Sequence, residues 1–428
     1  MFVTAGGTRV TLNPPSADEA SIRTTITITR PWDGAWQIGP SDEQITIHAP
    51  WVQTRWRDSL RVYSSYMGGQ IRDWPAAPAF HSSAAWPGFA YTPTIAAYDQ
   101  ASGSGIGLTA FSARLRQIEP IAWTDGNGVV GLFVRITPRL DRGESDTVAL
   151  ELRRFASGMP DEFFASYRKR FLLPWAKKLG IDEASCDASG VWVHDGWPGL
   201  VGANGLTSYQ PGNLIRIAEM CRARGAGGLV IWSTGERTAP GAMYENDHRE
   251  YPWFAEYAEA SKIFDGRFGC LIAPQAIMRP NAPREYIPGV DDAPTNLRAG
   301  AARRAVTQLR DDLRAAGVRF AYWDAAQNPA DQHGRWWVEP FDWLGLMMEW
   351  REAGITVFPE TSSDVAVFAS GATLFYPANP PLGDMRIPRI VTPRGRIFLM
   401  SPMENDAWRD DALRRGFVPF IWRENFLR

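Results

Sequence analysis

The sequence is poor in the residues on which metal and redox sites depend. Of its 428 residues only three are cysteine and five are histidine. Cys186, Cys221 and Cys270 are odd in number, widely spaced and without a CxxC pair, which favours neither a disulfide framework nor a zinc site. No histidines are clustered at metal-ligand spacing, and no glycine-rich phosphate loop occurs. We therefore expect three buried cysteines, no metal and no cofactor.

The chain also lacks an excess of one charge and any long apolar run. Lys and Arg total 45 against 47 Asp and Glu, without the basic surplus typical of nucleic-acid binding. No apolar run approaches the roughly 18 residues of a membrane span. The first ten residues (MFVTAGGTRV) lack the basic start and apolar middle of a signal peptide. We expect a soluble protein with no nucleic-acid partner, located in the cytoplasm or in a larger assembly; the sequence indicates no oligomeric state.

Aromatic residues, by contrast, are abundant. The chain contains 19 Trp, 21 Phe and 12 Tyr, more than a core of this size requires. Tryptophan offers a flat apolar face with a polar edge, which suits the C–H face of a sugar ring. Any single Trp is more simply a core residue, so only those at pocket-facing positions indicate a carbohydrate partner.

The first part of the chain has the pattern of antiparallel β-structure. Residues 24–29 (TTITIT) alternate strictly, and residues 95–111 contain two apolar runs around a Ser/Gly turn, which predicts a hairpin. Residues 160–178 then change to helical spacing. We predict an N-terminal antiparallel β-sandwich domain over 1–158, a linking helix over 159–187 and a second domain over 188–428.

The second domain repeats a short apolar strand, a loop and an amphipathic segment. Four helix ends carry a glycine directly before a strand, as in RAAGVRFAYW and REAGITVF. Eight such strands in about 240 residues are the strand number and domain length typical of an α/β fold of the (β/α)8 TIM-barrel type. The predicted strands are 191–194, 228–232, 269–273, 319–323, 355–358, 373–376, 396–400 and 417–421. The predicted helices are 213–224, 252–264, 296–316, 340–353 and 405–415, with short or irregular connections after the fifth and sixth strands.

Active sites of such barrels lie at the carboxyl ends of the strands, where polar residues follow each apolar run. Asp324 follows the fourth strand and Glu360 the fifth. Adjacent strands lie about 4.8 Å apart, which can bring two carboxylates to the roughly 5 to 5.5 Å separation of a retaining glycosidase. A strand-end carboxylate can equally be a helix cap or an arginine partner. The candidate sugar contacts are Trp192, His194, Asp195, Trp232, Gln275, Trp323, Trp336, Trp337 and Arg423.

At these positions the sequence resembles a known family. The strand end Tyr322-Trp323-Asp324, followed by Phe358-Pro359-Glu360, is similar to the catalytic strands of retaining α-glycosidases related to the endo-α-N-acetylgalactosaminidases and, more distantly, the melibiases. Residues 94–111 and 163–175 resemble a hairpin of their N-terminal β-supersandwich and their linking helix. The resemblance implies that Asp324 is the nucleophile, that Glu360 is the acid/base and that α-linked galactose or N-acetylgalactosamine-type sugars are the substrates.

Two other hypotheses stay open at this point. The same scaffold fits a non-catalytic carbohydrate-binding or structural component of a larger assembly such as a phage particle. A lyase or isomerase would need a metal or a lysine base, and the four lysines, Lys169, Lys177, Lys178 and Lys262, avoid the predicted strand ends.

Overall fold

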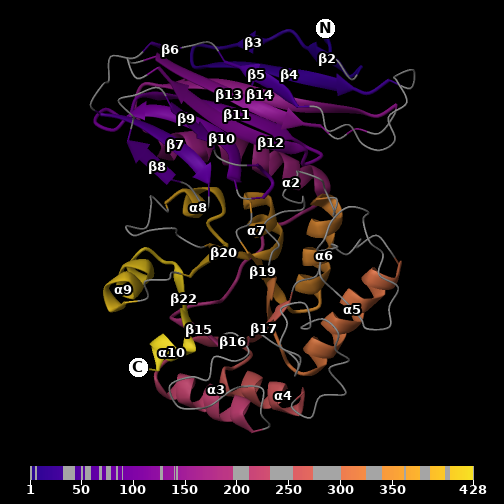
Figure 1. Cartoon of the computed structure of the whole chain (residues 1–428), viewed down its shortest axis with the longest axis vertical. Helices are drawn as coiled ribbons and strands as arrows, with labels where there is room; N and C mark the ends of the chain where they lie inside the picture. The colour runs from indigo at the N-terminus through magenta and orange to yellow at the C-terminus, as the bar shows by residue number, and fades with distance from the viewer. Residues whose placement is uncertain are drawn as a thin grey trace. The chain divides into compact units, whose positions relative to one another are not determined.

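The computed structural model describes two compact units (Figure 1). One unit comprises residues 1–182 with 383–393, and the other comprises 183–382 with 394–428. The linking helix therefore belongs to the first unit, as does a short segment from within the barrel sequence. The described residues are 2–4, 7–31, 44–49, 52–53, 59–66, 70–73, 79–82, 85–88, 90–125, 129–138, 140, 143–195, 212–231, 254–272, 300–323, 340–360, 363–375, 386–400 and 405–427.

The first unit contains two antiparallel sheets, which contact each other through β10 and β12. In the larger sheet, the strands in spatial order are β1 (Phe2–Val3), β2 (Arg9–Leu12), β4 (Ser21–Thr29), β14 (Ser145–Phe155), β11 (Gly105–Ser112), β10 (Ala90–Asp99), β7 (Leu60–Tyr66) and β8 (Gln70–Asp73), with β3 (Ser16–Ala17) paired to β4. The smaller sheet has β5 (Ile45–His48), β13 (Val129–Thr137), β12 (Gln117–Thr124) and β9 (Ala79–Ser82), with β6 (Val52–Gln53) paired to β13.

The predicted hairpin over 95–111 is confirmed as β10 and β11, with Tyr98 opposite Gly105. The predicted helix is a run of α1 (Asp161–Tyr167), the π-helical turn η1 (Arg168–Leu172) and α2 (Leu173–Leu179). It lies on the larger sheet, where a Cβ on Gly107 would collide with the Phe163 ring. Glycine therefore allows the close approach of helix and sheet.

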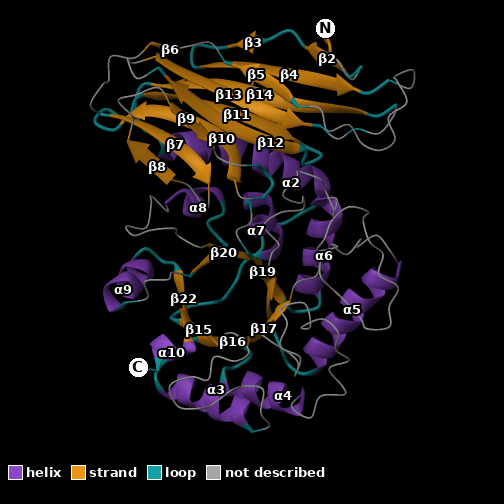
Figure 2. Cartoon of the chain, in the orientation of Figure 1, coloured by secondary structure: helices purple, strands orange, loops and turns teal. Residues whose placement is uncertain are grey.

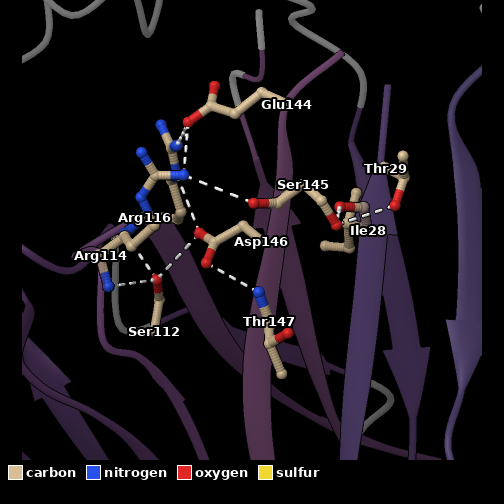
Figure 3. Close-up of polar contacts among 9 residues, drawn as sticks. All are labelled: Ile28, Thr29, Ser112, Arg114, Arg116, Glu144, Ser145, Asp146 and Thr147. Carbon is tan, nitrogen blue, oxygen red and sulfur yellow. Dashed lines mark hydrogen bonds and ion pairs between the residues drawn. The ribbon is translucent and has the colours of Figure 1, made fainter. Parts of the chain in front are cut away.

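A buried ion-pair network joins β11, β12 and β14 near one end of the larger sheet (Figure 3). The Arg116 guanidinium donates to Asp146 at 3.0 Å and to Glu144 at 2.6 Å. The side chains of Arg116 and Asp146 are only 9% and 5% exposed. The Ser112 hydroxyl accepts from the Arg116 amide at 3.1 Å, which fixes the backbone where β11 leads into β12.

Asp146→Ala should lower the free energy of unfolding of the first unit by about 3 to 5 kcal/mol, because it removes the more deeply buried of the two carboxylates that neutralise the buried Arg116 charge. The measurement is chemical unfolding followed by circular dichroism. The matched control is Glu119→Gln, which breaks the more exposed Arg135–Glu119 pair and should cost less than about 1 kcal/mol. Equal costs for the two variants would contradict the prediction.

The second unit is a near-closed barrel of eight parallel strands surrounded by helices (Figure 2). Every strand predicted from the sequence is present. The strands are β15 (Trp192–Asp195), β16 (Gly228–Ile231), β17 (Phe268–Ile272), β18 (Phe320–Trp323), β19 (Thr356–Pro359), β20 (Ala372–Phe375), β21 (Arg396–Leu399) and β22 (Val418–Trp422). The hydrogen-bonded neighbours follow the order β19, β18, β17, β16, β15, β22, β21 and β20. A single parallel bridge between Glu360 and Leu374 joins β19 to β20.

The long helices also agree with the prediction. They are α3 (Asn213–Ala223), α4 (Phe254–Ile263), α5 (Gly300–Ala315), α6 (Pro340–Glu352) and α9 (Asp406–Arg414), with a last short turn α10 (Arg423–Phe426). Gly317 and Gly354 have φ of 77° and 86° and end α5 and α6 directly before β18 and β19. Among the described residues, no helix is long and apolar enough to cross a membrane.

The connections after the fifth and sixth strands contain only short helices among the described residues, in line with the expected short or irregular connections. The fifth is followed by α7 (Asp364–Ser370) and the sixth by α8 (Arg386–Val391), which belongs to the first unit. There the Val391 carbonyl accepts from Arg168 Nε at 2.9 Å, and the Thr392 and Tyr91 hydroxyls are 2.5 Å apart. Ile387 and Val391 are fully buried.

Aromatic rings fill the barrel interior. The Trp192 ring lies 4.6 Å from Phe320 and 5.2 Å from Phe398, and Phe358 stacks on Phe398 at 4.4 Å. Trp192 can cross the barrel because glycine occupies the neighbouring position, where a Cβ on Gly228 would come within 2.5 Å of the indole. The carboxyl ends of the barrel strands therefore lie above a close-packed core of aromatic side chains.

Gly228→Ala should lower the free energy of unfolding of the barrel by about 1 to 3 kcal/mol, since the methyl group overpacks the Trp192 ring. A Cβ on Gly345 in α6 would meet no atom within 4 Å, so Gly345→Ala is the control. It should raise stability by about 0.5 to 1 kcal/mol, because alanine favours the helix. Chemical unfolding curves of the two variants would measure both effects, and a Gly228→Ala variant as stable as the wild type would refute the first.

Candidate active site

Glu360 lies directly at the carboxyl end of β19. Its backbone amide donates to the Trp323 carbonyl of β18 at 2.9 Å, so the ends of the fourth and fifth strands are adjacent, as predicted. Side chains alternate along a strand, so Glu360 faces the same way as Phe358, whose ring packs inside the barrel. The Glu360 side chain is half-buried and thus combines a fixed backbone with partial access to solvent.

The other side of Glu360 is fixed by β20. Thr373 donates its hydroxyl to the Pro359 carbonyl at 2.8 Å, next to the bridge between Glu360 and Leu374. Thr373 was not among the residues predicted from the sequence, because a threonine within an apolar strand gives no indication of its partner. Backbone contacts from two neighbouring strands therefore set the position of Glu360.

Trp192 and Trp323 have no free ring face for a sugar. Trp192 is fully buried inside the barrel between Phe320 and Phe398. Trp323 is equally buried but faces outward, where its ring contacts Trp343 of α6 at 4.8 Å. We therefore correct the assignment of these two residues from sugar binding to the core.

His194 is also part of the core. Its ring is fully buried at the end of β15, 4.6 Å from Phe420 and 4.0 Å from Trp422. Burial in this apolar layer lowers the pKa of His194 well below its ordinary value of 6.5, so the imidazole is neutral at neutral pH. The predicted contact with substrate is corrected to a neutral histidine inside the aromatic core.

The low pKa of His194 predicts how stability depends on pH. Below pH 6.5 the unfolded chain takes up a proton that the folded chain excludes, so the free energy of unfolding falls as the pH is lowered. The slope attributable to one such group is at most about 1.4 kcal/mol per pH unit. His194→Phe should remove this part of the slope, whereas replacement of the exposed His48 by Gln should retain it. Urea unfolding between pH 7 and 5 measures the free energy of unfolding. Equal slopes of this free energy against pH in the wild type and in His194→Phe would refute the role assigned to His194.

Asp195 and Arg423 bind each other. The guanidinium approaches the carboxylate at 2.8 Å, and both side chains are 4% exposed. Since alternation directs His194 inward, Asp195 at the next position faces the outside of the strand. The pair joins the end of β15 to the start of α10, so we correct the predicted role of both residues from binding sugar hydroxyls to joining these elements.

The remaining predicted site residues lie outside the described residues. They are Asp324, Trp232, Gln275, Trp336 and Trp337. All three cysteines are buried free thiols, as expected. Within the described part of the chain, no group of three or more His, Cys, Asp or Glu side chains could hold a metal ion. Of the predicted catalytic pair, Glu360 lies among the described residues, at the edge of the aromatic core.

Comparison with solved structures finds the same fold in enzymes that act on sugars. The α-N-acetylgalactosaminidase NagBb from Bifidobacterium bifidum, solved as a Gal-NHAc-DNJ complex, is 15% identical with a TM-score of 0.64, over 98% of this chain and 80% of that one. The GH36 α-galactosidase AgaB from Geobacillus stearothermophilus is 12% identical with a TM-score of 0.53, over 97% of this chain. An α-galactosidase from Lactobacillus brevis is 13% identical with a TM-score of 0.50, over 96% of this chain.

These structural similarities confirm the fold that the resemblance to α-glycosidases implied. The chain spans 64% of the length of the Geobacillus enzyme and 65% of that of the Lactobacillus enzyme. No protein-family model matches the sequence, and the search of curated proteins found no relative.

Proposed function

We propose that this protein is a glycoside hydrolase, a retaining α-glycosidase for α-linked galactose or N-acetylgalactosamine-type sugars. The observation that carries the proposal is the position of Glu360, a half-buried carboxylate on the inner face of β19, hydrogen-bonded through its amide to the end of β18. Asp324 is the next residue in sequence after that end. Enzymes with this fold include α-galactosidases and an α-N-acetylgalactosaminidase.

In the proposed mechanism Asp324 attacks the anomeric carbon of an α-glycoside and forms a β-linked glycosyl-enzyme. Glu360 protonates the departing glycosidic oxygen in this step, so that the C–O bond breaks and the aglycone leaves as an alcohol. Glu360, now a carboxylate, then takes a proton from water as the water oxygen attacks the same carbon from the face that the aglycone left. Asp324 is released as a carboxylate, and the sugar retains its α-configuration.

The other proposed sugar contacts are Trp232, Gln275, Trp336 and Trp337. A stacking indole and a hydrogen-bonding amide are the two kinds of group that a sugar ring needs. The fully buried tryptophans are excluded from this role by their packing.

A screen of chromogenic α- and β-glycosides, with NMR detection of the anomer released first, tests the proposal. We expect hydrolysis of an α-galactoside or an α-N-acetylgalactosaminide, with the α-anomer appearing before mutarotation. First release of the β-anomer would refute retention. Binding of these sugars without any hydrolysis would refute the enzyme and favour the carbohydrate-binding alternative.

A further inference from the structure

Trp323 contacts both the neighbouring strand and the helix layer outside the barrel. Its carbonyl accepts the Glu360 amide at 2.9 Å, in the ladder between β18 and β19. Its side chain points out of the barrel and contacts two tryptophans of α6. The residue that precedes Asp324 is thus tied both to Glu360 and to the surrounding helix layer.

The three tryptophans form a cluster behind the strand end. The rings of Trp323 and Trp343 are 4.8 Å apart, and Trp350 meets Trp323 edge to face at 5.4 Å and 85°. Trp323 and Trp350 are fully buried and Trp343 is 7% exposed. Within the described part of the chain, none of the three indole N–H groups has a hydrogen-bond partner. Packing alone therefore holds the cluster.

We propose that Trp343 and Trp350 are positioning residues, which act through Trp323 to fix the ends of β18 and β19 relative to each other. For the reaction, this inference rests on the proposed function, because it assigns the cluster the task of setting the separation between the Asp324 and Glu360 carboxylates. For the strand ends it rests on the packing and the hydrogen bond alone.

The ends of β18 and β19 have little freedom to move. Phe358 packs against the inner face of the barrel wall and the tryptophans pack against its outer face, so the ends of β18 and β19 are held from both sides. Removal of the Trp343 ring leaves space next to Trp323, into which its indole can move. The Trp323 carbonyl would shift with it, and the hydrogen bond from Glu360 would lengthen or open more often.

Hydrogen exchange of the Glu360 amide tests the inference without reference to activity. In full-length Trp343→Ala, or in Trp343→Leu should the first variant fail to fold, we expect this amide to exchange at least tenfold faster than in the wild type. The Met400 amide is the internal control, because it donates to the Phe375 carbonyl at 3.0 Å where β21 ends. Trp343→Phe is the control variant, since it keeps an aromatic ring and loses no indole hydrogen bond.

The inference is supported if the Glu360 amide alone is accelerated and Trp343→Phe restores its protection. It is overturned if neither amide changes, or if both accelerate equally, because the cluster would then only add to overall stability.

Kinetics distinguish this inference from the proposed function. With an active wild type, Trp343→Ala should lower kcat about a hundredfold, the effect of a 1 Å misplacement, while KM changes little. The acidic limb of the pH–rate profile should also shift, because the separation of two carboxylates influences their pKa values. An inactive wild type would refute the proposed function while the exchange result still decides the role of the cluster. Faster exchange with unchanged kinetics would limit that role to the strand ends.

Discussion

Replacing Asp324, the proposed nucleophile, by alanine is expected to reduce the hydrolysis of every α-glycoside substrate by roughly 10⁴- to 10⁶-fold, the loss typical when a catalytic nucleophile is removed. The effect should not depend on the leaving group, because no covalent intermediate can form with any substrate. Steady-state kinetics with an aryl glycoside and with an unactivated disaccharide measure it. Glu352→Gln, which changes an exposed carboxylate in the last turn of α6, is the control and should retain full activity.

Glu360→Ala should behave differently, because in the proposed mechanism Glu360 assists only the proton transfers. Hydrolysis of an unactivated disaccharide should fall by about 10²- to 10⁴-fold, whereas an aryl glycoside with a good leaving group should still glycosylate the enzyme. The intermediate should then accumulate, since no base activates water. Mass spectrometry of the intact protein would detect the added sugar.

Azide distinguishes the two roles by stereochemistry. In Glu360→Ala, azide should attack the glycosyl-enzyme from the face that water uses and give the α-glycosyl azide. In Asp324→Ala it should occupy the space left by the carboxylate, displace the aryl leaving group directly and give the β-glycosyl azide. The opposite pattern of products would exchange the two assignments. Full activity of both variants would place the reaction elsewhere in the protein.

Val391→Asp is expected to destabilise the first unit strongly. Val391 is fully buried, and its carbonyl binds Arg168 of the linking helix. An uncompensated charge at such a position costs more than about 4 kcal/mol. Since the stability of a domain is about 5 to 15 kcal/mol, the variant should lose much of its fold.

Calorimetry and near-ultraviolet circular dichroism would measure this loss. The matched control is Arg386→Gln at the start of the same helix, which removes an exposed 3.6 Å pair with Asp161 and should cost less than about 1 kcal/mol. A Val391→Asp variant that melts like the wild type would show that α8 contributes nothing to the stability of the first unit.

The sequence was sufficient to predict the strands of the barrel and its long helices. Each strand is a short apolar run that begins just after a helix end, and glycines such as Gly317 and Gly354 mark those ends with left-handed backbone. Helices α7 and α8 were missed because seven and six residues are too few for a helical period to be recognised. That α8 packs in the first unit depends on contacts far apart in sequence.

The candidate site was predicted less completely. The adjacency of β18 and β19, and with it the position of Glu360, follows from strand order. The direction of a side chain depends on the alternation within the strand, and this separates Glu360 on the inner face from Trp323 on the outer one. The Asp195–Arg423 pair could not be predicted, because each residue alone has the pattern of a strand-end ligand and only the fold brings them together.

The place of α8 in the chain has a consequence for synthesis on the ribosome. Residues 383–393 complete the first unit, but they are made only after six of the eight barrel strands. At about 5 to 20 residues per second, the interval after residue 182 lasts roughly ten to forty seconds. During this time the first unit lacks α8 and Thr392, and with them the Val391 carbonyl and the Thr392 hydroxyl that contact Arg168 and Tyr91 in the complete fold. Folding of the two units is thereby linked in time, and neither can be finished before most of the chain has been translated.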